Sequence, residues 1–290
     1  MAAQILDGRA LAERIREGVS GEVEELRAKG VVPTLASILV GENPAAEVYI
    51  RSQKRAAEKV GINYQLHRLG AETSEEELAS FIEGLNRDES VNGIILQLPI
   101  PQGLEAARRL QAKIAPEKDV EGVNPQNMGL VVYGRPRLTP CTPAAVMELI
   151  DSTGVDLYGK EATVVGHSEI VGKPVALLLL DRFCTTCVCH IATSERGNLR
   201  QHVENAEILV VAVGKANLIP GDWIREGAIV IDCGINRVGD RIVGDVEFEK
   251  AKERASFITP VPGGVGPVTT AILMRNTVEA TKWQLERRGG

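Results

Sequence analysis

Short apolar runs rich in β-branched residues alternate along the whole chain with longer amphipathic stretches. The apolar runs predict strands, and the amphipathic stretches between them predict helices. A strand regularly followed by a helix is typical of a parallel sheet with helices on both faces, so we expect an α/β protein. In the first half, the predicted strands are 34–41, 63–69 and 92–98, and the predicted helices are 10–30, 47–61 and 74–88.

A second alternating series follows the loop RPRLTPCTP at 135–143. Its strands are predicted at 162–166, 185–191, 207–214 and 228–235, and their density of apolar residues suggests a Rossmann-like, nucleotide-binding sheet. The stretch from Leu138 to Pro143, which holds two prolines, marks the expected domain boundary. We predict a first domain over 1–139, a second over 140–266, and a last helix within 267–290 that returns to the first domain.

Composition excludes several functional classes. The 290 residues are enough for two domains, and their net charge of −6 and 3% aromatic content argue against a nucleic-acid surface. The longest apolar run, 175–180, is too short to cross a bilayer. Because no secretory signal is visible at the N-terminus either, we expect a cytoplasmic protein with no membrane partner.

Three of the five cysteines lie in CTTCVCH, which holds Cys184, Cys187, Cys189 and His190. Such a set could bind zinc, but no second ligand pair stands elsewhere at metal spacing. The same segment also predicts a buried strand whose reduced thiols act as small apolar groups. We favour the strand and expect no metal.

The turn after the strand at 162–166 is glycine-rich. Gly166 stands at the strand end, Gly172 six residues on, and Pro174 opens an apolar helix. Glycines at such a turn let backbone N–H groups approach a pyrophosphate at the helix N-terminus. Ser168 replaces the second glycine of the usual dinucleotide pattern, so a plain tight bend remains the alternative.

The end of the next strand bears on the choice of cofactor. An NAD enzyme commonly places a carboxylate there for the ribose hydroxyls, whereas an NADP enzyme needs donors for the 2′-phosphate. Here His190 stands at the strand tip and Arg196 lies a little beyond, although Glu195 is close. The segment favours NADP.

Near the C-terminus, the stretch TPVPGGVGPVTT at 259–270 combines prolines and glycines. Prolines fix φ, while glycines permit close backbone approach, so this loop should be rigid and unhindered. It could form a wall for a flat ligand or merely connect a strand to a helix.

Taken together, five stretches resemble the bifunctional methylenetetrahydrofolate dehydrogenase/cyclohydrolases of the FolD type. The match runs in order and covers essentially the whole chain. Its motifs are GIILQLPIP (93–101), PEKDVEGVNPQNMG (116–129), GHSEIVGKP (166–174), VIDCGIN (230–236) and TPVPGGVGPVT (259–269).

The resemblance implies a homodimer whose chain has a catalytic domain, completed by the C-terminal helix, and a Rossmann-like NADP domain. Folate would bind in the cleft. The family transfers a hydride from 5,10-methylenetetrahydrofolate to the nicotinamide, and then hydrolyses the methenyl product to 10-formyltetrahydrofolate.

The resemblance also implies roles for individual residues. Tyr49 matches the tyrosine that stacks on folate, and Gln97 matches the glutamine of the QLP segment. The expected catalytic positions are Tyr49, Gln53, Gln97 and Glu121. The expected substrate-binding positions are Tyr49, Gln97, Leu98, Pro99, Glu121, Pro262, Gly263 and Gly266. The expected cofactor-binding positions are Thr142, Gly166, His167, Ser168, Ile170, His190, Ile191, Gly214, Cys233, Ile235 and Thr269.

One departure from the family pattern concerns chemistry. The family has Y-x-x-x-K on the first helix after the GENP turn, and its lysine transfers protons in the hydrolytic step. Counting from Tyr49, that position is Gln53, which shares the tyrosine's helix face, whereas Lys54 lies about a quarter turn away. An amide has no proton that titrates near neutral pH. We therefore expect the dehydrogenase to survive and the cyclohydrolase to be severely weakened.

Three further departures affect binding. Glu121 replaces the family aspartate and adds one methylene, which could shift folate affinity. His167 replaces the commoner arginine, and Ile191 stands where many members have serine near the 2′-phosphate, so NAD use remains open. Two alternatives to a bifunctional enzyme follow, namely a monofunctional dehydrogenase and a non-catalytic folate or nucleotide sensor. The intact cofactor turn and proline-glycine loop argue against the sensor.

Overall fold

The computed structural model describes residues 2–289. The chain divides into two compact units, each with its own parallel sheet. The six-stranded unit comprises the residues up to 12 together with 142–269, and the three-stranded unit comprises 13–141 with 270 onward. The α/β class expected from the alternating pattern is confirmed.

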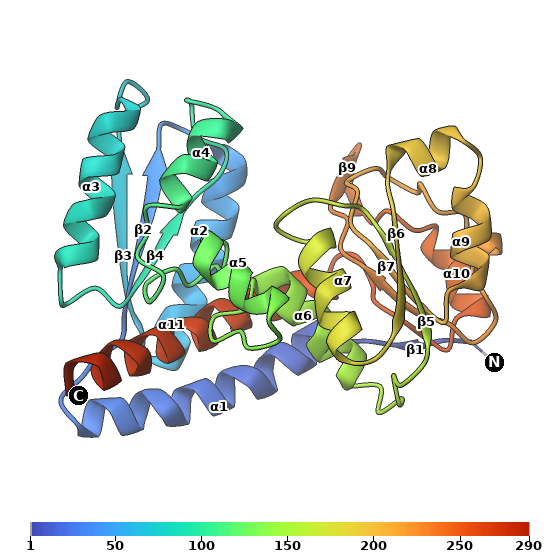
Figure 1. Cartoon of the computed structure of the whole chain (residues 1–290), viewed down its shortest axis with the longest axis horizontal. Helices are drawn as coiled ribbons and strands as arrows, with labels where there is room; N and C mark the ends of the chain where they lie inside the picture. Colours follow the sequence, from blue (N-terminus) through green and yellow to red (C-terminus); the bar gives the residue numbers. More distant parts are fainter. Residues whose placement is uncertain (1, 290) are drawn as a thin grey trace. The chain divides into compact units, whose positions relative to one another are not determined.

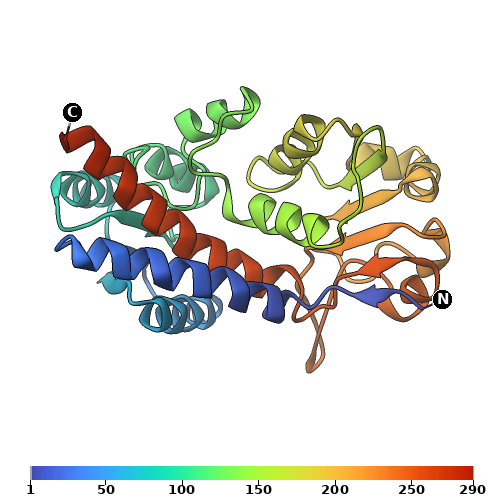
Figure 2. The same ribbon diagram turned by 90° about the horizontal axis from the view of Figure 1, so that it is seen from below.

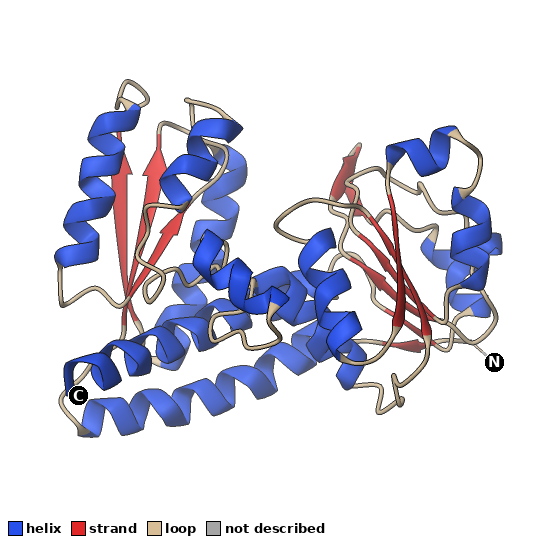
Figure 3. Ribbon diagram, viewed as in Figure 1, coloured by secondary structure: helices blue, strands red, loops and turns tan. Residues whose placement is uncertain are grey.

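The three-stranded unit is built on parallel strands in the order β3-β2-β4 (Figures 1 and 3). Its strands are β2 (Thr34–Val40), β3 (Asn63–Leu69) and β4 (Gly93–Leu96). Its helices are α1 (Gly8–Ala28, from residue 13), α2 (Pro44–Val60), α3 (Glu75–Arg87), α4 (Leu104–Gln111), α5 (Pro125–Val132) and α11 (Val265–Gly289, from residue 270).

Side-chain alternation on β2 divides the core of this unit into two faces. Ala36 and Ile38 point to the face that α3 and α4 cover, where they join one apolar cluster. Leu39 points to the other face and packs against Ala46 and Ile50 of α2. Ser37 shares the parity of Leu39, so it also points toward the α2 face.

The C-terminal helix is anchored within the three-stranded unit. Lys282 of α11 pairs with Glu22 of α1 at 2.8 Å, and Figures 1 and 2 show the two helices side by side. Gln284 donates to the carbonyl oxygens of Asn92 and Glu117 at 2.7 and 2.9 Å. These bonds tie α11 to the segments on either side of β4.

The six-stranded unit holds a parallel sheet in the order β1-β11-β8-β7-β5-β6. Its strands are β1 (Gln4–Ile5), β5 (Glu161–Val165), β6 (Thr185–Cys189), β7 (Ile208–Val211), β8 (Ile229–Asp232) and β11 (Phe257–Ile258). Its helices are α6 (Cys141–Asp151, from residue 142), α7 (Gly172–Asp181), α8 (Ile191–Glu195), α9 (Leu199–Asn205) and α10 (Phe248–Arg254), with a 3₁₀ turn at Gly221–Trp223.

Helices cover both faces of this sheet. Val165, Leu209 and Val230 form one apolar cluster with residues of α9 and α10. The apolar helix α7 packs on β5 and β6, and Figure 1 shows it on the opposite side of the sheet from α9. The Rossmann-like arrangement expected for the second series is therefore present.

The segment TTCVCHI corrects one prediction in detail. It forms β6, but the strand ends at Cys189, and Ile191 already belongs to α8. We expected a buried strand, yet Thr185 and Val188 are exposed. The physical reason is that β6 lies at the edge of the sheet, where no strand covers its outer side.

Other elements were not predicted. The strands β1 and β11 have two residues each, too few for a periodicity signal. The antiparallel hairpin of β9 (Asn236–Val238) and β10 (Arg241–Val243) was also missed. The last helix begins at Val265, two residues earlier than expected. None of the helices in the described range combines the length and apolar character that a membrane span requires.

Candidate active site

A hydrogen-bonded network lies on the α2 face of the three-stranded sheet. Gln97, which follows β4, donates through Nε2 to Oε1 of Gln53 on α2 at 2.8 Å and to Oγ of Ser37 on β2 at 3.0 Å. The Tyr64 hydroxyl on β3 donates to the same Gln53 oxygen at 3.0 Å. Gln53 Oε1 thus accepts two bonds, which leaves its Nε2 as the donor end of the amide.

The network is withdrawn from solvent. Gln53 and Gln97 are 8% and 5% exposed. Burial raises the pKa of Tyr64 to about 12, against the opposing hydrogen bond with Ser37. Tyr64 therefore stays protonated near neutral pH, and it acts on Gln53 as a hydrogen-bond donor.

The helix geometry expected for α2 is confirmed. Gln53 points inward, whereas Lys54 and Arg55, the next two residues, are exposed. Lys54 lies 3.9 Å from Glu58, one turn further along α2. Tyr49, one turn before Gln53, is 50% exposed, so its ring is available to a ligand at the solvent end of the same face.

One carboxyl oxygen of Glu121 is buried outside the Gln53 network. It follows the short β-bridge between Ile94 and Asp119, and its Oε2 is buried with no hydrogen-bond partner in the described part of the chain. Burial raises the pKa of Glu121 to about 8, assisted by the nearby charge of Asp119 and opposed by a hydrogen bond with Gln111. A buried carboxyl oxygen with no partner is a natural hydrogen-bonding site for a polar group of a ligand.

The other expected substrate residues lie in two segments. Leu98 and Pro99 follow Gln97 directly, and the peptide bond between them is cis, as is the one before Pro262. In the six-stranded unit, the proline-glycine loop packs closely on the start of α1, since a Cβ at Gly8 would lie 1.8 Å from the Gly264 carbonyl oxygen. Gly266 falls in the first turn of α11 rather than in the loop.

A cavity of about 430 Å³ opens at the carboxyl ends of β5 and β7 in the six-stranded unit. Its volume falls in the usual range for small-molecule sites, and its place at the strand ends is where such sheets bind nucleotides. Its walls include five of the expected cofactor residues, namely Gly166, His167, Ser168, His190 and Ile191.

The glycine turn at the cavity is required by close packing. Gly166 has φ of 123°, and a Cβ there would lie 2.3 Å from the Ala212 carbonyl oxygen. A Cβ at Gly172 would meet the Gly166 carbonyl oxygen at 2.1 Å. Ser168 completes the turn, because its Oγ accepts from the backbone N–H of Val171 at 3.2 Å.

The charges around the cavity suit a phosphorylated ligand. Lys173 and Lys215 line it together with His167 and His190, whose rings lie 5.3 Å apart, and Glu169 is the acidic residue among the lining groups. No carboxylate follows β6 at its tip, since His190 occupies that position. This arrangement offers cationic and neutral donors where an NADP site needs them.

The buried side chain of Asp245 fixes the loop that follows β7. Asp245 Oδ2 accepts from the backbone N–H of Val213 and Gly214 at 2.7 and 2.9 Å, and its Oδ1 accepts from that of Lys215 at 2.8 Å. Val213 and Lys215 line the cavity, so Asp245 shapes one wall without touching it.

The cavity also shows what the sequence prediction missed. Among the described residues, the expected positions that do not line it are Thr142, Ile170, Gly214, Cys233, Ile235 and Thr269. The lining residues we had not named include Glu169, Lys173, Ser194, Leu199, Val213 and Lys215. Lys173 directly follows the second glycine of the turn, and a cationic residue at this position was a usable sequence signal for phosphate binding. In the three-stranded unit, Ser37 and Tyr64 were missed as well.

Two family models match the chain. One describes the catalytic domain of tetrahydrofolate dehydrogenase/cyclohydrolase and matches residues 6–121. The other describes the NAD(P)-binding domain of the same family and matches residues 140–285. Together they cover most of the sequence.

Curated relatives agree over nearly the full length. The chain is 51% identical over 283 residues to the bifunctional protein FolD of Moorella thermoacetica, covering 97% of this chain and 100% of that protein. It is 50% identical over 281 residues to the bifunctional protein FolD 2 of Geobacter sulfurreducens, covering 97% of each.

Solved structures show the same relationship. The bifunctional FolD enzyme of Campylobacter jejuni is 42% identical with a TM-score of 0.94, over 98% of this chain and 100% of that one. The Trypanosoma brucei FolD, complexed with NADP cofactor and an inhibitor, is 38% identical with a TM-score of 0.93, over 98% and 99%. The chain therefore belongs to the tetrahydrofolate dehydrogenase/cyclohydrolase family.

Proposed function

We propose that this protein oxidises 5,10-methylenetetrahydrofolate to the 5,10-methenyl cation with NADP as the hydride acceptor. Family membership supports the reaction. The cavity with its glycine turn, two lysines and two histidines supports the cofactor. The Trypanosoma relative contains NADP. In this family the nicotinamide ring of NADP accepts the hydride, and the protein has to hold the folate and the cofactor together and exclude water.

The residues of the chain suit that task. Ser168 and Gly166 would hold the pyrophosphate end through the backbone, and His190 with the lysines would meet the 2′-phosphate. Tyr49 offers its half-exposed ring for stacking, and Gln97 presents the carbonyl end of an amide whose donor end is already bound. Glu121 would accept from the pterin through its unpartnered oxygen.

The same site argues for a dehydrogenase whose cyclohydrolase activity is severely weakened. The observation that supports this conclusion is Gln53, a buried amide whose oxygen accepts hydrogen bonds from Gln97 and Tyr64. It stands where the family has its proton-transferring lysine, and its own protons do not titrate. Losing a general acid or base typically lowers a rate by about 10²–10⁴-fold.

No neighbour in the network replaces that proton carrier. The pKa of Tyr64 is raised to about 12, which makes it a poor acid near neutral pH. Glu121 has a pKa of about 8, which is closer to neutral pH than the pKa of Tyr64. It belongs, however, to the segment after the Ile94–Asp119 bridge and makes no hydrogen bond within the Gln53 network as described. We assign it to substrate binding.

One assay separates the candidate functions. Purified protein is given 5,10-methylenetetrahydrofolate with NADP or NAD, and cofactor reduction is followed by absorbance. Reduction with NADP supports the dehydrogenase, and its absence with both cofactors would leave only the sensor. Decay of the methenyl product is then compared with the uncatalysed rate. Decay at the rate of a bifunctional relative would overturn the weakened cyclohydrolase.

We also infer from the resemblance that the protein is a homodimer, which light scattering in solution tests. The functional division proposed is a folate-binding domain over 1–139 with 267–290, and a cofactor domain over 140–266. Within this division, the residues up to 12, including strand β1, pack in the six-stranded unit. The cytoplasmic location expected from the sequence stays a prediction.

A further inference from the structure

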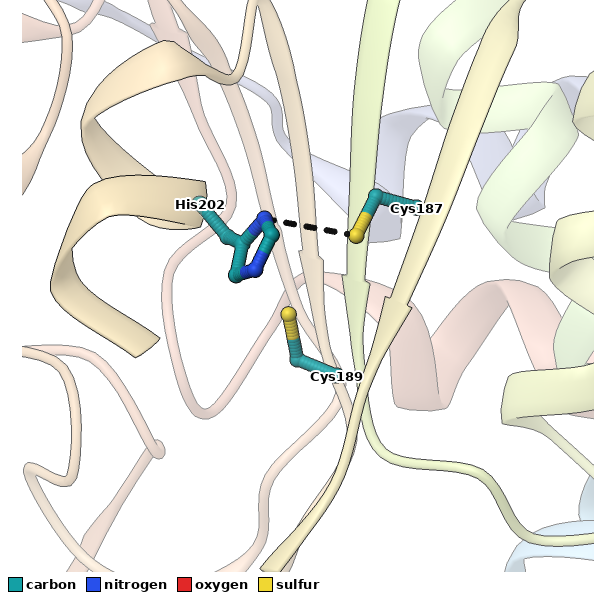
Figure 4. Close-up of side chains that lie close together, drawn as sticks. All are labelled: Cys187, Cys189 and His202. Atoms are coloured by element: carbon teal, nitrogen blue, oxygen red, sulfur yellow. Dashed lines mark hydrogen bonds between the residues drawn. The ribbon is translucent and has the colours of Figure 1, made fainter. Parts of the chain in front are cut away.

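Two cysteines and a histidine meet beside β6, outside the site described above. Cys187 and Cys189 stand two apart on this strand, so their side chains share one face. His202 of α9 lies over the same face, and Figure 4 shows the two sulfurs and the imidazole ring turned toward one another. The sulfur atoms and one ring nitrogen all lie within 4.8 Å of each other.

We propose that Cys187, Cys189 and His202 form a binding site for a thiophilic divalent cation, with zinc as the best-fitting ion. Thiolate and imidazole groups are the ligands that zinc prefers. His190, which the sequence pattern had suggested as the histidine partner, instead packs its ring on His167. The expectation of no metal rested on that pattern, and the fold supplies a different histidine.

The distances support a tetrahedral site. In such a site, Zn–S bonds of about 2.3 Å and Zn–N bonds of about 2.05 Å place sulfur and nitrogen about 3.5–3.6 Å apart. The Cys187 Sγ and His202 Nδ1 atoms lie 3.5 Å apart. In a tetrahedral zinc site the two sulfurs are about 3.8 Å apart, so the Cys187 and Cys189 sulfurs, which lie within 4.8 Å of each other, have to approach by at most about 1 Å.

Burial and backbone contacts hold the three groups in place. Cys189 is fully buried, whereas Cys187 and His202 are partly exposed, which gives an ion a route from solvent and leaves a fourth position for water. Thr163 of β5 donates to the His202 carbonyl oxygen at 3.0 Å, so α9 is fixed against the sheet at this residue. The site is therefore built on regular elements rather than on a loop.

Binding is a ligand exchange without oxidation. Zn²⁺ displaces one proton from each thiol, the Nδ1 lone pair of His202 completes the protein ligands, and two protons enter the solvent for each ion bound. The ion would join β6 to α9 next to the cofactor cavity, since His190 follows Cys189 directly and Leu199 of α9 lines that cavity.

A disulfide between Cys187 and Cys189 is the competing chemistry. Residues two apart on a strand have Cα atoms about 6.6–6.8 Å apart, at the upper limit of disulfide geometry. This geometry disfavours the disulfide and leaves both thiols free to bind a metal ion. Mass spectrometry of protein purified without reductant shows whether the disulfide has formed.

The test uses the reduced full chain and zinc alone, measured by equilibrium dialysis and by proton release in weak buffer. Cobalt in place of zinc should give the thiolate charge-transfer absorption of a tetrahedral site. We expect about one ion per chain, a raised thermal midpoint, and at least tenfold weaker binding in both Cys187→Ser and His202→Gln. Cys184→Ser is the matched control, because this buried cysteine immediately before β6 lies outside the cluster, and its replacement should leave zinc binding unchanged.

Far-ultraviolet circular dichroism confirms that each variant is folded. The proposal is overturned if the reduced chain binds no zinc, if Cys187→Ser and His202→Gln bind it as tightly as the unaltered protein, or if Cys184→Ser weakens it equally. A Cys187–Cys189 disulfide in the freshly purified protein, with no zinc bound after reduction, would also overturn it.

Discussion

The Nε2 atom of Gln97 donates a 2.8 Å hydrogen bond to Oε1 of Gln53, and the same Nε2 donates to Oγ of Ser37 at 3.0 Å. This bond fixes which end of each amide is free. Gln53 keeps its NH₂ group and Gln97 keeps its carbonyl oxygen for a ligand, so neither amide can supply or remove a titrating proton.

Replacing Gln53 by lysine should restore hydrolysis. The lysine would place a titratable amine among Gln97 and Tyr64, and methenyltetrahydrofolate hydrolysis should rise by about 10²–10⁴-fold. Dehydrogenase activity should change much less. Lys54→Gln is the control, because Lys54 is exposed and should affect neither rate. An unchanged hydrolysis rate in folded Gln53→Lys would contradict the role given to this position.

Tyr64→Phe should lower stability without abolishing the dehydrogenase. It removes one donor to a buried oxygen that keeps its bond from Gln97, so the free energy of unfolding should fall by about 0.5–1.5 kcal/mol. Urea unfolding measures this loss. Tyr133→Phe is the control, since Tyr133 is 80% exposed and its change should be within error. Equal losses in both variants would argue against the hydrogen bond as the cause.

Gly166→Ala should disrupt the cofactor turn. The new Cβ would lie 2.3 Å from a backbone oxygen at φ of 123°, so the turn has to shift, and NADP affinity should fall at least about tenfold. Gly197→Ala is a matched control, because Gly197 also has positive φ but open space around it. Fluorescence titration with NADP compares them. Similar affinities in the two variants would show that the close approach is not needed.

His190→Asp should shift the cofactor preference. A carboxylate at the tip of β6 repels the 2′-phosphate and can accept from ribose hydroxyls, so the ratio of kcat/KM for NADP over NAD should fall at least about tenfold. His190→Asn changes the side chain without adding charge and should alter the ratio much less. If both variants keep the original ratio, the 2′-phosphate binds elsewhere.

The sequence predicted the sheets well where apolar runs were long. β2 and β7 are short, mostly apolar segments rich in β-branched residues, which is typical of buried strands. The two-residue strands β1 and β11 were missed because their pairing comes from tertiary packing. Gln53 could be placed from helix geometry alone, and a serine inside the otherwise apolar TLASILV was a usable signal for Ser37.

Contacts across elements were beyond the sequence. Tyr64 reaches Gln53 only because β3 pairs with β2 in a register that no local pattern fixes. His202 approaches Cys187 only because α8 ends early and α9 folds back on the sheet. The nearest histidine in the sequence, His190, pointed to the wrong partner.

The stability of the protein should depend on pH through Glu121. Burial raises the pKa of Glu121 from the ordinary 4.5 to about 8, so between these values the folded chain holds a proton that the unfolded chain has lost. By linkage, this residue lowers the free energy of unfolding as pH rises across that window, by at most about 1.4 kcal/mol per pH unit.

Glu121→Gln removes this titration, so the variant should gain stability relative to the unaltered protein as pH rises from about 4.5 to about 8, with no further gain above that range. Urea unfolding at a series of pH values measures the difference. A constant difference for Glu121→Gln would mean that its carboxylate is already charged in the folded protein, and folate binding would then meet an anion rather than a neutral acid.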